Sequence, residues 1–452
     1  MSEQIRLKKG LDIPVAGAAS PTIAKTVSAD IVAIKPTDFR ALVPKMVVKE
    51  GDRVLAGDPL FVDKNRPQVC FCSPASGTVK AVVRGEKRKL LEVQVEVDGK
   101  MEYRRKKAAA PASLTREKAA ARMLEMGLWP MVIQRPYGIV ANPDDSPKSI
   151  FISAMDTAPL APDYDFVLQN RFDDVQAGID ILGKFTKGGI HFSMNYFTCP
   201  SSDFNKLRGV IFHEFSGKHP AGNVGVQINH ISPINKGDIV WTVDLLSLAM
   251  IGKAFNEGIY DASRLVAVTG PAAKSPAYVN AIQGAPMSAF SDFFDSSDNV
   301  RLVSGNILTG NNVGPDGFLG FFDNQVTVLK EGDYYETFGW CKPFRGKKFS
   351  ISHTYWSWLA GGKKKYDMDT NTNGGPRPFV VSDVYAKVLP MDIYPVYLAK
   401  ACLAKDIEKM ENLGIYEVLP EDFALCEFVC PSKVDIQQII SDGIDLMLKE
   451  MA

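Results

Sequence analysis

The sequence predicts a multidomain α+β protein, and three observations lead to this prediction. The chain has 452 residues, which is too long for one ordinary core and indicates about three domains. Short β segments separated by glycine fill residues 30–100, strands and helices alternate over residues 112–260, and residues 395–452 have a helical pattern. Apolar residues at 46% and charged residues at 23% exclude a disordered, collagen-like or coiled-coil chain.

The glycine-separated strands predict a small β sandwich near the N-terminus. Gly51 and Gly57, each followed by aspartate, supply turns, and residues 91–97 alternate with the period of two that is typical of a strand. The pattern V-x-x-G-D-x-V-x-x-G-x-x-L, followed by P-x-x-G-x-V, resembles the biotinyl/lipoyl-like barrel-sandwich domains. We therefore assign residues 1–107 to an N-terminal segment and a barrel-sandwich domain.

Carrier domains of that type hold a modified lysine on the hairpin between their halves, where this chain has Lys64. Pro67 stiffens the turn, no methionine flanks the lysine, and the distance along the chain to Pro74 is longer than carrier domains use. We favour an unmodified scaffold over a lipoyl or biotin attachment site. An intact mass equal to that of the plain sequence would exclude the attachment.

Residues 112–260 predict a Rossmann-like α/β domain. Residues 115–126 have helical spacing and stop at Gly127, residues 149–154 form a buried apolar strand, and residues 172–184 read as a helix. Further strands and helices alternate up to the end of the region. This order favours a parallel sheet covered by helices.

Residues 261–332 predict a small β-grasp module. Strands at residues 265–271, 300–303 and 326–329 surround a predicted helix at residues 286–294.

The rest of the chain divides into an irregular aromatic and basic region, 333–394, and a helical C-terminal domain, 395–452. In the first, Trp356 and Trp358 precede several lysines, a combination that suits a membrane interface, a docking surface or a core aromatic pair beside a solvated loop. The last helix, 434–449, places one apolar stripe on a face: Ile436, Ile439, Ile440, Ile444 and Met447.

Charge and hydropathy exclude several classes of function. Lysine plus arginine and aspartate plus glutamate both number 52, so no net charge attracts the chain to nucleic acid. No signal peptide is recognisable, and the most apolar window, residues 239–251, contains Asp244 and is too short to span a bilayer. Seven cysteines, an odd number, suit a reducing compartment. We expect a chain on the cytoplasmic side of a membrane or in the cytoplasm.

The sequence lacks the usual nucleotide-binding loops. No G-x-G-x-x-G follows a predicted strand, and Gly314-x-x-Gly317-x-x-Gly320 lacks the close first pair of glycines. No Gly-Lys pair precedes serine or threonine, so the phosphate loop of NTPases is also absent.

Three of the five histidines, His213, His219 and His230, fall within 18 residues. The first two are six positions apart, which excludes the zinc helix that needs a spacing of four. Residues 215–230 read as a loop after a strand, the place where open α/β sheets bind ligands. The alternative is that these histidines are hydrogen-bonded packing groups.

The cysteines give no complete metal site. Cys426 and Cys430 with the following proline form the closing half of a four-iron cluster motif, but Phe423 and Pro420 occupy the other two positions. We interpret this as a degenerate cluster remnant and expect no metal. Cys70 and Cys72 share one face of a strand, where two thiols alone make a weak metal site and ordinary packing is the simpler interpretation.

Over nearly its whole length the chain resembles the NqrA family, one component of the sodium-translocating NADH:quinone oxidoreductase of bacteria. Six motifs carry the resemblance: Ile5–Pro14, Gly127–Pro130 with Arg135–Tyr137, Pro147–Leu160, His219–Gly222 before His230, Val388–Ile393 and Cys426–Pro431.

The resemblance implies the same domains, with a β-grasp module of the SLBB type. It implies a peripheral protein, without a transmembrane helix, on the cytoplasmic side of the bacterial inner membrane. Its partners are the other subunits, especially the membrane subunits, of a six-subunit complex that oxidises NADH, reduces quinone and pumps Na⁺ out of the cell. FMN, FAD, riboflavin, iron–sulfur and Na⁺ are expected in those partners. This chain is expected to bind no cofactor tightly and not to be catalytic alone.

The resemblance also implies that quinone, the substrate, binds to this chain. Because a quinone needs an apolar slot and groups that supply protons, we expect its headgroup near the clustered histidines. The predicted site residues are His213, Glu214, His219 and His230, with Pro220, Gly222 and Gly225 shaping the backbone. The competing hypothesis is an assembly scaffold without a ligand, which would dock through the β-grasp module and the loop of Trp356 and Trp358.

Overall fold

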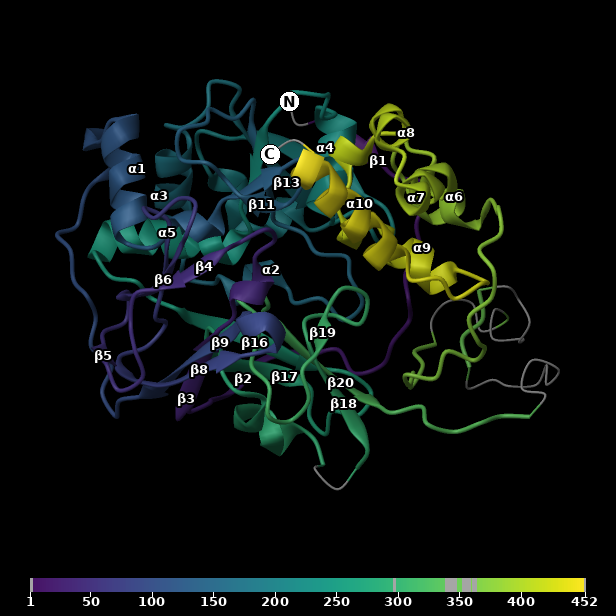
Figure 1. Cartoon of the computed structure of the whole chain (residues 1–452), viewed down its shortest axis with the longest axis horizontal. Helices are drawn as coiled ribbons and strands as arrows, with labels where there is room; N and C mark the ends of the chain where they lie inside the picture. Colours follow the sequence, from purple (N-terminus) through teal and green to yellow (C-terminus); the bar gives the residue numbers. More distant parts are fainter. Residues whose placement is uncertain (1–2, 296–297, 338–347, 352–358, 360–363, 451–452) are drawn as a thin grey trace.

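The computed structural model describes residues 3–295, 298–337, 348–351, 359 and 364–450. Trp356 and Trp358 lie outside these residues. The fold contains the four predicted parts, namely a barrel sandwich, an α/β domain, an SLBB-type sheet and C-terminal helices (Figure 1).

The barrel-sandwich domain consists of two facing sheets. Glycine turns separate its short strands, as the sequence predicts, and apolar side chains such as Val32, Phe61, Phe71 and Val93 fill the space between the sheets. One sheet has the order β3 (Ile31–Ile34), β9 (Leu90–Val97), β8 (Gly77–Arg84) and β5 (Arg53–Val54). The other has the order β4 (Pro44–Met46), β6 (Pro59–Asp63) and β7 (Cys70–Cys72).

The α/β domain is built on a seven-stranded sheet. Its central strands are parallel, and β10 and β11 form an antiparallel hairpin at one edge. The strand order is β1 (Glu3–Arg6), β14 (Ile211–Ser216), β13 (Ile190–Asn195), β12 (Ile150–Ser153), β15 (Val240–Thr242), β10 (Ile133–Arg135) and β11 (Ile139–Val140). The helices are α1 (Arg116–Glu125), α2 (Tyr164–Val167), α3 (Phe172–Leu182), α4 (Val224–Ile231) and α5 (Leu245–Glu257).

The two faces of this sheet belong to different cores. Phe192 of β13 packs in the core that contains α3 and α5, whereas Phe151 of β12 and Phe215 of β14 pack in a second core with α4 and the C-terminal helices. Because side chains alternate along a strand, this division fixes which residues of β13 and β14 face the C-terminal domain.

The SLBB-type sheet has six strands. The predicted helix at residues 286–294 is a 3₁₀ helix, Met287–Phe293. The strand order is β19 (Asn311–Asn312), β18 (Val300–Ser304), β20 (Gln325–Lys330), β16 (Ser263–Thr269), β17 (Ala277–Ile282) and β2 (Ser20–Thr26).

The N-terminal segment connects two of these sheets. β1 lies parallel to β14, with Ile5 opposite Phe215, and β2 lies parallel to β17. Between them the backbone follows the end of β14, because the amides of Leu7 and Leu11 donate to the carbonyls of Ser216 and His219 at 2.8 Å. This segment therefore forms a wall beside the clustered histidines.

The C-terminal domain is helical, as predicted, and packs beside α4 (Figure 1). The predicted stripe is buried at Ile436, Ile440, Ile444 and Met447, whereas Ile439 is only partly buried. No helix within the described ranges is long and apolar enough to cross a membrane. The helices are α6 (Val384–Val388), α7 (Pro395–Ala404), α8 (Ile407–Asn412), α9 (Ala424–Val429) and α10 (Ile436–Glu450).

Candidate functional site

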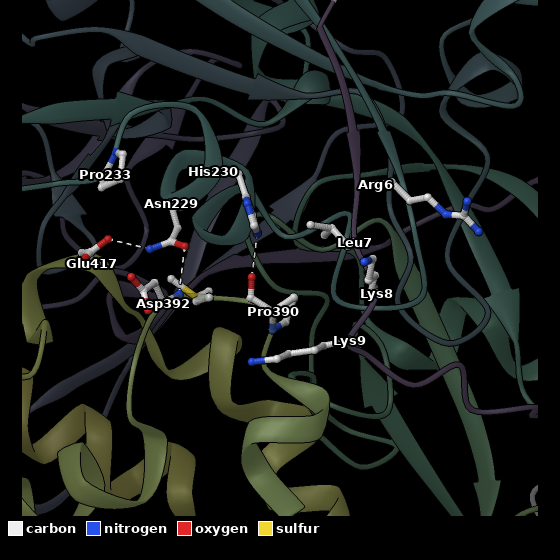
Figure 2. A pocket seen from close by; sticks show the side chains of 11 residues that line it. Arg6, Leu7, Lys8, Lys9, Asn229, His230, Pro233, Pro390, Asp392 and Glu417 are labelled. Atoms are coloured by element: carbon white, nitrogen blue, oxygen red, sulfur yellow. Dashed lines mark hydrogen bonds between the residues drawn. The ribbon is translucent and has the colours of Figure 1, made fainter.

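A cavity of about 540 Å³ lies where three parts of the chain meet: the N-terminal segment, the end of α4 and the connection before α7 (Figure 2). Its lining combines charged and apolar residues, a combination suited to a small polar headgroup on an apolar body. The lining residues are Arg6, Leu7, Lys8, Lys9, Asn229, His230, Pro233, Pro390, Met391, Asp392 and Glu417.

The positive and negative side chains of the cavity come from different parts of the chain. Arg6, Lys8 and Lys9 belong to the N-terminal segment, whereas Asp392 and Glu417 belong to the C-terminal domain. In Figure 2 the Lys9 side chain extends from the N-terminal segment toward Pro390. The positive wall could stabilise negative charge that develops on a bound molecule.

His230 is the member of the predicted set that lines the cavity. It lies in the last turn of α4, and its Nε2 is 2.7 Å from the carbonyl oxygen of Pro390. Because a carbonyl only accepts, Nε2 carries the proton of this bond. Nδ1 is therefore the ring atom that remains for a ligand.

Asn229 links the end of α4 to the C-terminal domain at the cavity. Its Nδ2 donates to Glu417 Oε2 at 2.7 Å, and its Oδ1 accepts from the backbone amide of Asp392 at 3.2 Å. Burial raises the pKa of Glu417 above its usual value, and the bond from Asn229 opposes this. Sequence reasoning missed Asn229, Glu417 and the lysines because they lie in segments far apart in the chain.

His219 lies outside the cavity, buried in the loop between β14 and α4. Its Nδ1 is 3.1 Å from Thr157 Oγ1, which also accepts from the amide of Gly222 at 2.9 Å, and its own amide donates to Asp12 Oδ1 at 2.9 Å. Burial lowers the pKa of His219 to about 4. The imidazole is thus a neutral group bonded to Thr157, while the backbone amide of His219 ties the loop to the N-terminal segment.

The pKa of His219 predicts a pH dependence of stability. A histidine whose folded pKa lies below its unfolded value stabilises the fold fully above pH ~6.5 and loses that contribution as the pH falls toward 4. We expect the His219→Gln variant to show a shallower loss of unfolding free energy over this window, by at most about 3 kcal/mol. Urea unfolding at several pH values measures the difference from the unmodified chain, with Lys80→Gln, at an exposed position of β8, as the control that leaves every histidine in place. If the unfolding free energies of the unmodified chain and the His219 variant changed with pH in parallel, this prediction would be contradicted.

His213 and Glu214 are not brought to the cavity. His213 is buried on β14, where its Nε2 is 2.9 Å from Nδ1 of His191, and His191 stacks on Phe151 with ring centroids 4.6 Å apart. Burial and, to a smaller extent, the neighbouring His213 lower the pKa of His191 to about 4. Glu214 follows His213 in the strand and so points to the other face of the sheet.

The prediction of a loop over residues 215–230 is wrong at both ends. β14 continues through Ser216, and α4 begins at Val224, so that the loop after Pro220 is short and Gly225 lies in the first turn of the helix. The glycines serve close packing rather than chain reversal. A Cβ at Gly222 would lie 2.7 Å from the amide nitrogen of Thr157, and a Cβ at Gly225 would lie 2.6 Å from Asp422 Oδ2.

Cys426 and Cys430 lie in the core of the C-terminal domain. The hydroxyl of Tyr385 is 2.9 Å from Cys430 Sγ, and burial raises the pKa of Cys426 well above its usual value. In the part of the chain that the structure describes, no group of three His, Cys, Asp or Glu side chains is placed to hold a metal ion. Lys64 is exposed in the turn after β6.

Comparison with known proteins gives the family. Models of the NqrA N-terminal barrel-sandwich hybrid domain, the NqrA second alpha/beta domain and the NQRA C-terminal domain match residues 5–98, 114–260 and 265–314. The chain is 35% identical to the A subunit of the Na⁺-translocating NADH-quinone reductase of Rhodopirellula baltica, covering 98% of both chains. It is also 35% identical to the A subunit of the same reductase from Vibrio atlanticus, covering 99% of this chain and 100% of that one.

The chain belongs to the NqrA family of Na⁺-translocating NADH-quinone reductases. The NqrA protein of Actinobacillus pleuropneumoniae, 36% identical over 99% of this chain and 100% of its own length, agrees with this assignment. A solved structure of an air-oxidised NAD⁺-reducing [NiFe]-hydrogenase is similar at a TM-score of 0.39 and 13% identity, covering 76% of this chain and 64% of that one, which is too weak to carry an argument.

Proposed function

We propose that this chain is the NqrA component of a membrane-bound complex that oxidises NADH, reduces quinone and translocates Na⁺. The observation that carries the proposal is the similarity to NqrA proteins over almost the full length of both chains. In this proposal the chain is peripheral, lies on the cytoplasmic face of the inner membrane and docks on membrane subunits. Flavins, the iron–sulfur centre and the Na⁺ path belong to those partners.

The contribution of this chain, in our proposal, is a quinone headgroup site at the cavity of His230. Leu7, Pro390 and Met391 offer apolar contacts to the ring, while Lys8 and Lys9 add positive charge to the cavity lining. As a quinone carbonyl gains electron density, a nearby cation stabilises the charge on its oxygen. His230 Nδ1 is the atom available to exchange a proton with that oxygen, because Nε2 is held by Pro390.

This proposal narrows the predicted site and gives its members different roles. His230 is a candidate contact, whereas His219, Pro220 and Gly222 shape the loop that supports α4, and Gly225 lets α4 approach the C-terminal domain. His213 and Glu214 are not among the residues that line the cavity.

Titration of the full chain with a short-chain, water-soluble quinone tests the site. We expect saturable binding by calorimetry, weakened roughly tenfold by His230→Ala and by Lys9→Gln, since losing a hydrogen bond to a charged group costs ~1.5 kcal/mol or more. Lys80→Gln, on an exposed position of β8, is the matched control and should bind as the unmodified chain does. Equal affinity for His230→Ala and the unmodified chain would contradict the site.

The second candidate is an assembly scaffold without a ligand. Exposed apolar side chains on and before α7 favour it, since Tyr394 is 68% and Tyr397 57% exposed, with their rings 6.3 Å apart. Such a pair suits a contact with another protein of the complex. Absence of saturable quinone binding in the same titration, together with intact assembly of the complex, would favour the scaffold.

A further inference from the structure

Two thiols lie side by side beneath the junction of the barrel sandwich and the α/β domain. Cys70 and Cys72 occupy the same face of the edge strand β7, and their sulfurs are 4.0 Å apart. Cys70 Sγ is also 3.2 Å from the carbonyl oxygen of Leu124, near the end of α1. Gly127 leaves the room for Cys72, because a Cβ at that position would overlap its sulfur.

The two thiols have unequal surroundings. Cys70 is half-buried, whereas Cys72 is 1% exposed. The hydrogen bond from the Cys72 thiol lowers the pKa of Cys70, and the guanidinium of Arg104 lowers it further, while the same pairing and burial raise the pKa of Cys72. Asp58 and Tyr260 are the other titratable groups near the pair. A partly exposed thiol with a lowered pKa beside a buried second thiol is the arrangement of an attacking and a resolving cysteine.

The other buried thiols that the structure describes do not share this arrangement. Cys426 and Cys430 lie in the core of the C-terminal domain, and the pKa of Cys426 is raised by burial. Cys402 is buried under α10, and burial raises its pKa to about 11. Without a partly exposed partner thiol of lowered pKa, these thiols are not expected to begin an exchange reaction.

We propose that Cys70 and Cys72 form a thiol–disulfide exchange site for low-molecular-weight disulfides. The Cys70 thiolate attacks one sulfur of the small disulfide, forms a mixed disulfide and releases the first small thiolate. The Cys72 thiol loses its proton to solvent and attacks Cys70 Sγ, which forms the Cys70–Cys72 bond and releases the second small thiolate. The small disulfide is reduced by two electrons and the protein dithiol is oxidised by two. The site is independent of the proposed quinone cavity.

Incubation of the full folded chain with excess glutathione disulfide, followed by alkylation and peptide mapping, tests this site. The tryptic peptide of residues 65–80 contains only these two cysteines. We expect it to become lighter by two hydrogen atoms in the unmodified chain and to resist alkylation. In Cys72→Ser we expect a stable glutathione adduct on Cys70, because the resolving thiol is missing. In Cys70→Ser we expect Cys72 to remain unmodified.

Two results would overturn the proposal. One is an unmodified chain that stays reduced or stops at a mixed disulfide at residues 65–80, since neither gives the two-step exchange. The other is modification of Cys72 in Cys70→Ser at the rate seen for Cys70, which would remove the distinction between the two thiols. Thermal unfolding of both serine variants checks that they are folded, and a third variant, Cys199→Ser, should react at residues 65–80 as the unmodified chain does.

Discussion

Replacing Arg135 by methionine is expected to lower the free energy of unfolding by about 3–5 kcal/mol, the cost of breaking a buried ion pair at one partner. Arg135, in β10, is 2% exposed, and its Nη1 lies 3.1 Å from Oδ2 of the fully buried Asp422 in the C-terminal domain. Its Nη2 pairs with Glu421. The methionine would leave the Asp422 carboxylate buried without its cation. Urea unfolding of the full chain measures the loss.

A second substitution separates loss of charge pairing from loss of packing. In Arg135→Met/Asp422→Asn the buried charge is gone, while the amide oxygen of the asparagine can still accept from the amide of Leu419, as Asp422 does at 2.9 Å. We expect part of the stability to return. Lys206→Met is the control, because Lys206 and Asp203 form an exposed pair worth at most about 1 kcal/mol. A loss for Arg135→Met no larger than for Lys206→Met would contradict the role of the pair.

Replacing Gly10 by alanine should weaken both the fold and quinone binding. Gly10 has a φ of 129°, and a Cβ there would overlap the carbonyl oxygen of His219. The substitution must therefore move the N-terminal segment away from the histidine loop, and Lys8 and Lys9 move with it. We expect a loss of about 1–3 kcal/mol in stability and a roughly tenfold weaker affinity for a short-chain quinone.

Gly51→Ala is the matched control for that experiment. Gly51 also has a positive φ, 87°, but nothing lies within 4 Å of a Cβ at this position. The variant should therefore carry only the cost of the backbone conformation and should bind quinone as the unmodified chain does. Equal quinone affinity in Gly10→Ala and Gly51→Ala would show that the N-terminal segment is not part of the site.

The features that the sequence predicts correctly are local. The alternation at residues 91–97 lies in β9, and the helix predicted to stop at Gly127 is α1, where the φ of 67° at Gly127 is the left-handed conformation that glycine adopts after a helix end. The stripe ending at Met447 becomes the buried face of α10. In each case hydrophobic periodicity or a cap within one element determines the outcome.

The features that the sequence does not predict depend on contacts between distant segments. β1 pairs with β14 across about half the chain, and nothing in residues 3–6 indicates this partner. The same holds for Asn229 and Glu417, which meet at the cavity only because the C-terminal domain packs on α4. The sequence pattern places Gly225 in a loop, whereas the helix requires glycine there because Arg135 and Asp422 lie against it.

Photoaffinity labelling tests the central claim, that quinone binds at the cavity of His230, most directly. The full chain, or the assembled complex, is irradiated with a quinone that carries a photoreactive group on its ring, with and without excess unlabelled quinone. The account predicts displaceable label on residues 6–9, 229–233 or 390–392, and its loss in His230→Ala. Displaceable label confined to β13 or the exposed Phe197 beyond it, with these three segments unlabelled, would contradict the account.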